Sequence, residues 1–150
     1  MHLADFYSPD TISVDLQGRG KDEILAELVG LLQLDERSTD TLLRILQRRE
    51  TLGSTGVGRG IAIPHCRSLV VNRVRLAYGH HRKGVEYQAI DNRPVFDFFL
   101  IVAPPLEVSN QYLPVLGKIA QFAKDADIPE RLAALRTPDD FFRLLGEKGV

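Results

Sequence analysis

Residues 53–67 of the chain read Gly53-Ser-Thr-Gly-Val-Gly-Arg-Gly-Ile-Ala-Ile-Pro-His65-Cys-Arg67. Glycines at this density allow positive φ angles and a close approach of the backbone to a bound group. Consecutive N–H groups in such a loop can form a concave site for an anion. Pro64 fixes its own φ and favours an extended conformation at Ile63, so His65 is held on a stiffened chain beside the loop. The pattern predicts a histidine that can be phosphorylated.

The glycines do not fit two common phosphate-binding motifs. Gly53 and Gly58 have the spacing of a P-loop, but Arg59-Gly60 stands where that motif needs lysine followed by serine or threonine. A dinucleotide-binding pattern fails because the glycines do not read G-x-G-x-x-G and no clear strand precedes them. For each feature taken singly, an ordinary loop and a packed or surface histidine remain open alternatives.

Composition narrows the class of protein. The 150 residues suit one domain, residues 1–150, and the net charge of −1 lacks the clustered basic excess of nucleic-acid binding. The single Cys66 has no intramolecular disulfide partner, which fits a reducing cytoplasm. The first residues do not resemble a signal peptide, and no apolar run is long enough to cross a bilayer. We expect a cytoplasmic protein without membrane insertion and without a nucleic-acid partner.

Periodicity indicates strands interspersed with helices. Alternation predicts a strand over 12–16, and apolar stripes predict helices over 22–32 and from a Ser38 or Thr39 cap to about residue 50. Further strands are predicted over 74–78, 85–87 and 95–102, the last buried on both faces. Three more helices are expected after the capping residues Asn110, Asp127 and Thr137. This order favours an α/β sandwich, in which helices flank a mixed central sheet.

Several side chains need an interpretation within this pattern. Arg49 follows Leu42, Ile45 and Leu46 on one helical stripe, so it points inward in the last turn, close to the glycine loop. Its side chain either supports a phosphate there or only offsets the helix dipole. For the helix after Asn110, we expect an apolar face made of Leu113, Leu116, Ala120 and Ala123.

Two features of the predicted strands remained without a functional role. His80 and His81 are adjacent on a strand and point to opposite faces, so they do not readily chelate one metal, and we expect them at the surface or rim. Asp97 interrupts the apolar strand, where an ionised carboxylate is costly unless it is paired or lies near the edge, and the sequence does not show which of these applies.

Taken together, the residues carry a resemblance to a known family. Glu50, a six-residue gap and Val57-Gly58-x-x-Ile61-Ala62-Ile63-Pro64-His65-Cys66 resemble the phosphorylation-site pattern of the type-2 IIA domains of the bacterial phosphotransferase system. Similar segments elsewhere are Arg49-Glu50, Gly53-Ser54-Thr55-Gly56, Lys83-Gly84-Val85, Asp91-Asn92-x-Pro94-Val95 and Phe99-Leu100-Ile101-Val102-Ala103-Pro104. The resemblance covers nearly the whole chain and is greatest to the nitrogen-regulatory members of this mannitol/fructose class.

The resemblance implies a phosphocarrier. His65 would accept a phosphoryl group from a phosphohistidine on an HPr-type carrier, then hold it as a regulatory signal or pass it to a cysteine of a IIB domain. Imidazole suits this role because it is nucleophilic and forms a labile N–P bond. Since phosphoryl transfer mainly requires positioning and charge stabilisation, the candidates to assist it are Arg49, Ser54, Thr55 and the loop N–H groups. No cofactor and no metal are implied.

One position departs from the family pattern. Members usually carry a second histidine near the start of the helix after the apolar strand, where alignment on Val102-Ala103-Pro104 places Tyr112. A tyrosine hydroxyl can donate one hydrogen bond to a phosphoryl oxygen but carries no positive charge near neutral pH. We therefore expect Tyr112 to belong to the site and to alter the transfer rate and the stability of the phosphorylated form.

Two functions stay open at this point. One is a regulator of the nitrogen type; the other is a IIA component for sugar uptake of the fructose/mannitol class. The sequence contains no IIB or IIC region, and a free-standing IIA domain with a changed second site favours regulation, although free-standing transport components exist. A cysteine-based or metal-dependent enzyme using His65 and Cys66 is a weaker hypothesis, because neighbouring side chains on a strand diverge. We expect a stoichiometric phosphocarrier more than a small-molecule enzyme.

Overall fold

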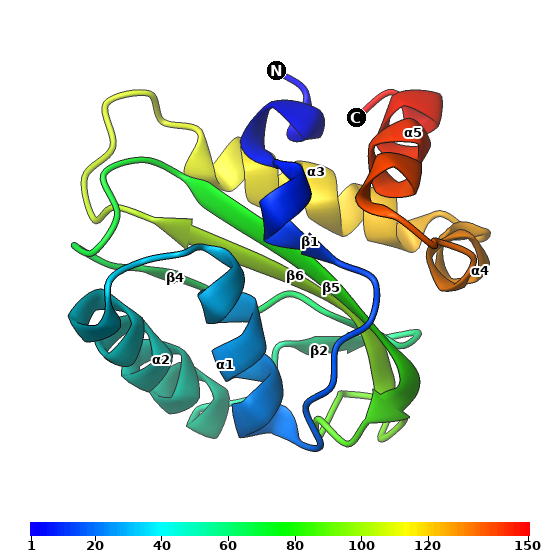
Figure 1. Ribbon diagram of the computed structural model, residues 1–150, viewed down its shortest axis with the longest axis horizontal. Coiled ribbons are helices and arrows are strands. Elements are labelled where there is room, and N and C mark those ends of the chain that lie inside the picture. Colours follow the sequence, from blue (N-terminus) through cyan, green and yellow to red (C-terminus); the bar gives the residue numbers. More distant parts are fainter.

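The computed structural model describes residues 1–150 and has three layers, with a mixed sheet between two layers of helices. The helices are α1 (Lys21–Leu31), α2 (Glu36–Thr51), α3 (Tyr112–Lys124), α4 (Ile128–Ala133) and α5 (Pro138–Lys148), after the short 3₁₀ helices η1 (Leu3–Phe6) and η2 (Pro9–Thr11). Helices α1 and α2 cover one face of the sheet, and α3, α4 and α5 cover the other (Figure 1). The predicted α/β fold is confirmed. No helix combines the length and the apolar composition that crossing a bilayer requires.

The sheet places the histidine on an edge strand. The strands are β1 (Ile12–Ser13), β2 (Gly56–Gly58), β3 (Ile61–Ala62), β4 (His65–Arg67), β5 (Arg75–Val85) and β6 (Val95–Ala103). Their order is β1-β5-β6-β3-β2, and β4 pairs with β6 beyond β3. Strands β5 and β6 are antiparallel, whereas β3 and β4 run parallel to β6. Strands β3 and β4 thus pair in succession with the same side of β6, and Pro64 lies in the segment that joins them. Strand β4 has no other strand on its outer side.

Strand β6 forms the centre of both cores. Phe98 and Leu100 pack into the core under α1 and α2, whereas Phe99 and Ile101 pack into the core under α3, α4 and α5. Alternation of side chains along a strand produces this division. All of these side chains are buried, which confirms the predicted central strand.

The buried Asp97 has two partners on strand β5. Its carboxylate accepts hydrogen bonds from the Tyr78 hydroxyl at 2.6 Å and from His80 Nδ1 at 2.7 Å. Burial and the nearby carboxylate raise the pKa of Tyr78, so its hydroxyl keeps the proton that it donates. The prediction that His80 lies at the surface or rim is wrong. Strand β5 continues to Val85, which keeps His80 inside the sheet, directly opposite Asp97.

The structure corrects three predicted helix caps. Helix α3 follows Gln111 and not the predicted Asn110, and no side chain caps it. Helix α2 begins earlier than expected because Asp35 is its N-cap, with its carboxylate accepting from Ser38 N at 2.8 Å. Asp127 precedes α4 without a capping hydrogen bond from its side chain. Thr137 caps α5 as predicted, in a reciprocal pair with Asp140.

Helix α3 packs on a different stripe from the predicted one. Its buried side chains are Tyr112, Val115, Ile119, Phe122 and Ala123, while Leu113 is exposed. The helix offers two adjacent apolar stripes, and packing against Phe99 and its neighbours selects the one that starts at Tyr112.

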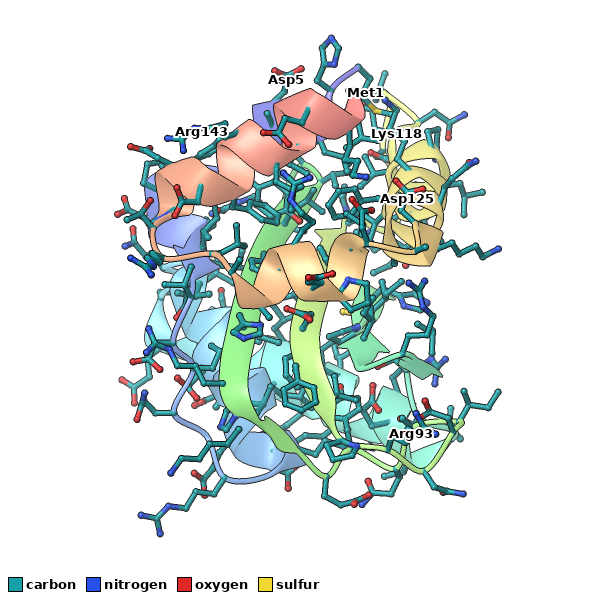
Figure 2. The ribbon with its side chains drawn as sticks, turned by 90° about the vertical axis from the view of Figure 1, so that its right-hand side faces the viewer. Met1, Asp5, Arg93, Lys118, Asp125 and Arg143 are labelled. Atoms are coloured by element: carbon teal, nitrogen blue, oxygen red, sulfur yellow. The ribbon has the colours of Figure 1, made fainter.

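Both ends of the chain join the layer of helices α3 to α5. Figure 2 shows Met1 close to Lys118, whose Nζ donates to the Met1 carbonyl oxygen at 2.9 Å. Leu3 N donates to the carbonyl oxygen of Val150 at 3.0 Å. These bonds hold the N-terminal segment against α3 and α5.

Candidate functional site

His65 is the first residue of β4 and is half-buried. Its Nδ1 lies 2.7 Å from the carbonyl oxygen of Ile63. Because a carbonyl oxygen only accepts hydrogen bonds, Nδ1 carries the proton, and the ring lone pair lies on Nε2. Pro64, between the two residues, restricts the backbone that sets this contact. The structure thus makes Nε2 the nucleophilic atom of His65.

The neighbours of His65 on β4 face opposite sides of the sheet. Cys66 packs against the core under α1 and α2, so His65 and Arg67 face the side of α3. Burial raises the pKa of Cys66 to about 12. A thiol with that pKa stays protonated at neutral pH, which argues against Cys66 as a nucleophile.

Tyr112 begins α3 on the side that His65 faces. The Arg67 guanidinium lies 4.4 Å from the centroid of the Tyr112 ring, and Arg67 Nη1 donates to the Pro104 carbonyl oxygen at 2.9 Å. No group of the protein forms a hydrogen bond with the Tyr112 hydroxyl. The sequence analysis did not select Arg67, although its position two residues after His65 on a strand was a usable signal.

Two arginines influence Tyr112 from different layers. Burial raises the pKa of Tyr112, and the positive charges of Arg67 and Arg49 partly offset the effect. Arg49 lies in the last turn of α2, as predicted, and its Nη1 donates to the Gly53 carbonyl oxygen at 2.7 Å. The predicted inward direction is only partly right, because Leu42 and Leu46 are buried whereas Arg49 is half-buried and lines the outer side of the helix with Ile45. Arg49 therefore belongs to the α2 layer and Tyr112 to the α3 layer.

The glycine loop is held by its own hydroxyl groups. Ser54 Oγ donates to the Tyr87 carbonyl oxygen at 2.8 Å and accepts from Gly56 N at 3.0 Å. The Thr55 hydroxyl donates to the Glu50 carboxylate, which also accepts from Thr55 N at 3.1 Å. Several loop N–H groups are therefore bonded within the protein. The loop is less open to an anion than its glycines predicted.

A buried ion pair between Lys21 and Glu50 supports the glycine loop through Thr55. Glu50 is 7% exposed, and its Oε1 lies 3.1 Å from Lys21 Nζ. The same ammonium group lies 4.5 Å from the centroid of the Tyr87 ring. This network joins the start of α1, the end of α2 and the glycine loop at Thr55. Sequence reasoning missed it, because Lys21 lies far from the motif and no spacing relates the two.

The structure contains no group of three His, Cys, Asp or Glu side chains arranged to hold a metal ion. His65 and Arg67 share one face of β4, the Arg67 guanidinium lies over the Tyr112 ring, and Arg49 is bonded to the glycine loop. These residues supply one imidazole, two guanidinium groups and one phenol hydroxyl. Such groups suit an anion bound to the imidazole, because they donate hydrogen bonds and supply positive charge.

Comparison with known proteins identifies the class. The family described as phosphoenolpyruvate-dependent sugar phosphotransferase system, EIIA 2, matches residues 5–148, and the chain belongs to this family. The nitrogen regulatory protein of Pseudomonas aeruginosa is 31% identical over 147 residues, which are 97% of this chain and 95% of that protein. The crystal structure of the nitrogen regulatory protein IIA-Ntr from Neisseria meningitidis superposes with a TM-score of 0.85 at 28% identity, covering 95% of this chain and 98% of that one.

A sugar-specific relative is also similar. The fructose-specific EIIABC component of Bacillus subtilis is 25% identical over 149 residues, which are 98% of this chain but 23% of that protein. The resemblance seen in the sequence, to type-2 IIA domains and above all to nitrogen-regulatory members, is confirmed.

Proposed function

We propose that the chain is a phosphocarrier that accepts a phosphoryl group on His65 from an HPr-type carrier and acts as a regulator of the nitrogen type. The observation that carries the proposal is the hydrogen bond from His65 Nδ1 to the Ile63 carbonyl oxygen. It leaves Nε2 free to react and stabilises the positive charge that the ring acquires on phosphorylation.

The transfer is a displacement at phosphorus. The Nε2 lone pair forms a new N–P bond while the N–P bond on the carrier breaks, and the carrier nitrogen recovers its electron pair. The Nδ1 proton of His65 stays in place, so no proton moves between the proteins. Arg49, Arg67 and the Tyr112 hydroxyl stabilise the phosphoryl oxygens, whereas Ser54 and Thr55 act by shaping the loop.

Exposed apolar side chains support the docking of a protein at this site. Of eight large apolar side chains that are exposed, six lie on the segments that supply or flank the site: Leu52, Val57, Leu69, Leu106, Val108 and Leu113. Large apolar side chains left exposed around a functional site are typical of a protein interface. The region suits a macromolecular phosphoryl donor better than a small one.

The relatives support regulation over transport. The regulatory relative from Pseudomonas aeruginosa is the more similar of the two, and this chain matches 95% of it. The alternative is a IIA component that passes the phosphoryl group to a IIB domain for fructose- or mannitol-class sugar uptake. The similarity to a fructose-specific EIIABC component favours this second function.

Phosphorylation with purified partner proteins tests both the regulatory and the transport function. The protein is incubated with phosphoenolpyruvate, enzyme I and an HPr-type carrier, and the label is mapped by mass spectrometry at alkaline pH. We expect one acid-labile label that is lost in His65→Ala; label that survives this substitution would overturn the proposal. A fructose-type IIB domain is then added. Retention of the label supports the regulator, and discharge to the IIB cysteine supports transport.

A further inference from the structure

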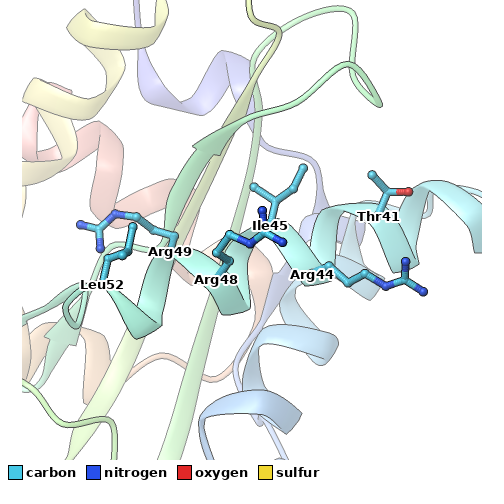
Figure 3. Close-up of a pocket in the computed structure, with 6 residues that line it drawn as sticks. All are labelled: Thr41, Arg44, Ile45, Arg48, Arg49 and Leu52. Atoms are coloured by element: carbon cyan, nitrogen blue, oxygen red, sulfur yellow. The ribbon is translucent and has the colours of Figure 1, made fainter.

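A groove of about 420 Å³ follows the outer side of α2 (Figure 3). Its lining residues are Thr41, Arg44, Ile45, Arg48, Arg49 and Leu52. All of them belong to α2 or to its C-cap, so the groove is a feature of one helix face. The adjacent face of α2, with Leu42 and Leu46, is buried in the core.

The spacing of the lining residues is that of a helix-packing seam. Thr41, Ile45, Arg48 and Leu52 are separated by four, three and four positions, as are the core positions of a coiled coil. Arg44 directly precedes Ile45 and Arg49 directly follows Arg48. These are the flanking positions at which charged side chains pair between two helices. Helix α2 therefore has a second packing stripe, about 16 Å long, with no helix on it.

The stripe is positively charged and has no internal counter-charge. Arg44 and Arg48 are exposed, and neither side chain forms an ion pair or a hydrogen bond with the protein. Asp40 precedes Arg44 by one helical turn but does not pair with it. Ile45 lies between Arg44 and Arg48, and Leu52, which is 82% exposed, follows Arg49 at the end of the stripe. The charge and spacing of this stripe are complementary to a second helix that carries apolar residues at its own seam positions and carboxylates at the flanking positions.

We propose that this stripe binds an acidic amphipathic helix of a partner protein, and that phosphorylation of His65 weakens the binding. The second part rests on the proposed function. Arg49 lines the groove, and its guanidinium also donates to the Gly53 carbonyl oxygen in the glycine loop that leads to His65. A phosphoryl group on His65 draws the Arg49 guanidinium away from the groove and adds negative charge close to an acidic ligand. The unphosphorylated protein is therefore the form that selects this partner.

A designed peptide provides the probe. A fluorescein-labelled peptide of about 21 residues carries leucines at the seam positions and glutamates at the flanking positions, a length at which a helix can form. Two comparison peptides carry glutamine in place of glutamate or the same residues in scrambled order. Fluorescence anisotropy measures their binding to the unphosphorylated chain. We expect the glutamate peptide to bind, with Arg44→Gln/Arg48→Gln raising its Kd about tenfold.

The matched control is Arg93→Gln/Arg136→Gln, which removes the same charge from exposed positions elsewhere and is expected to leave the Kd unchanged. Equal binding of the glutamine or scrambled peptide, or equal losses in the two double variants, would overturn the groove as a specific site. The titration is repeated with chain phosphorylated on His65, for which we expect about fivefold weaker binding. Equal Kd values for the phosphorylated and unphosphorylated chains would overturn the proposed effect of His65 phosphorylation on the groove. A chain that accepts no phosphoryl group refutes the proposed function, while the first titration still decides the groove.

Discussion

His65 donates its Nδ1 proton to the carbonyl oxygen of Ile63, two residues earlier in the chain, across 2.7 Å. This contact predicts that the phosphoryl group is attached to Nε2. NMR coupling between ³¹P and the ring ¹⁵N nuclei of the phosphorylated protein distinguishes the two nitrogens. Attachment at Nδ1 would contradict the prediction, because it requires loss of the bond to Ile63.

Arg49 is expected to support the phosphoryl group more than the fold. Arg49→Ala should slow phosphorylation roughly 10²-fold, as for loss of one positioned donor, and change the unfolding free energy by less than about 1 kcal/mol. Arg49→Lys should restore part of the rate, because lysine lacks the planar fork. Rates of label incorporation and urea denaturation measure both effects, with Arg48→Ala as the exposed neighbouring control. A normal rate in Arg49→Ala would refute the role.

Tyr112 is expected to donate a hydrogen bond from a protonated hydroxyl, because burial raises its pKa above 10.0. Tyr112→Phe keeps the ring under Arg67 and removes the donor, so phosphorylation should slow while stability stays unchanged. Tyr112→His should speed transfer or make it pH-dependent between mildly acidic and neutral pH, since charge-assisted hydrogen bonds are about twice as strong. Equal phosphorylation rates in all three proteins would make Tyr112 only a packing residue.

Glu50 is expected to be the main support of the glycine loop. Glu50→Ala leaves the Lys21 ammonium and the Thr55 donors without their partner, so the unfolding free energy should fall by about 3–5 kcal/mol. Glu50→Gln keeps an acceptor for Thr55 and should lose less. Adding Lys21→Met to Glu50→Gln should recover stability, because no unpaired charge remains. Urea denaturation measures the series, and a stable Glu50→Ala protein would argue against the network.

Cys66 is expected to be unreactive in the folded protein. Its pKa is raised from 9.0 to about 12 by burial, so alkylation by iodoacetamide at pH 8 should be far slower than in the unfolded chain. The unfolded chain loses this proton near pH 9 and the folded chain near pH 12. Ionisation of the Cys66 thiol therefore favours the unfolded chain, so the unfolding free energy falls as the pH rises through that range. Fast alkylation of the native protein at pH 8 would revive the cysteine-based hypothesis.

Local patterns in the sequence determined much of the framework. The apolar run from Val95 to Val102 specified a buried strand, and the stripe from Leu42 to Leu46 placed Arg49 in the last turn of a helix near the loop. Pro64 specified a restricted backbone before His65. These features depend on periodicity and on backbone constraints between near neighbours, which are properties of the sequence itself.

The tertiary structure alone decided which distant side chains meet. It paired Asp97 with His80, joined Lys21 to Glu50, and placed Arg67 over Tyr112. It also chose the Tyr112 side of α3 as the packed face over the predicted stripe that begins at Leu113. Each of these contacts joins separate elements, so its partners follow from the register of strands and the layering of helices. No local spacing in the sequence encodes those relationships, because buried polar groups find their partners only when the sheet and its two helical layers have assembled.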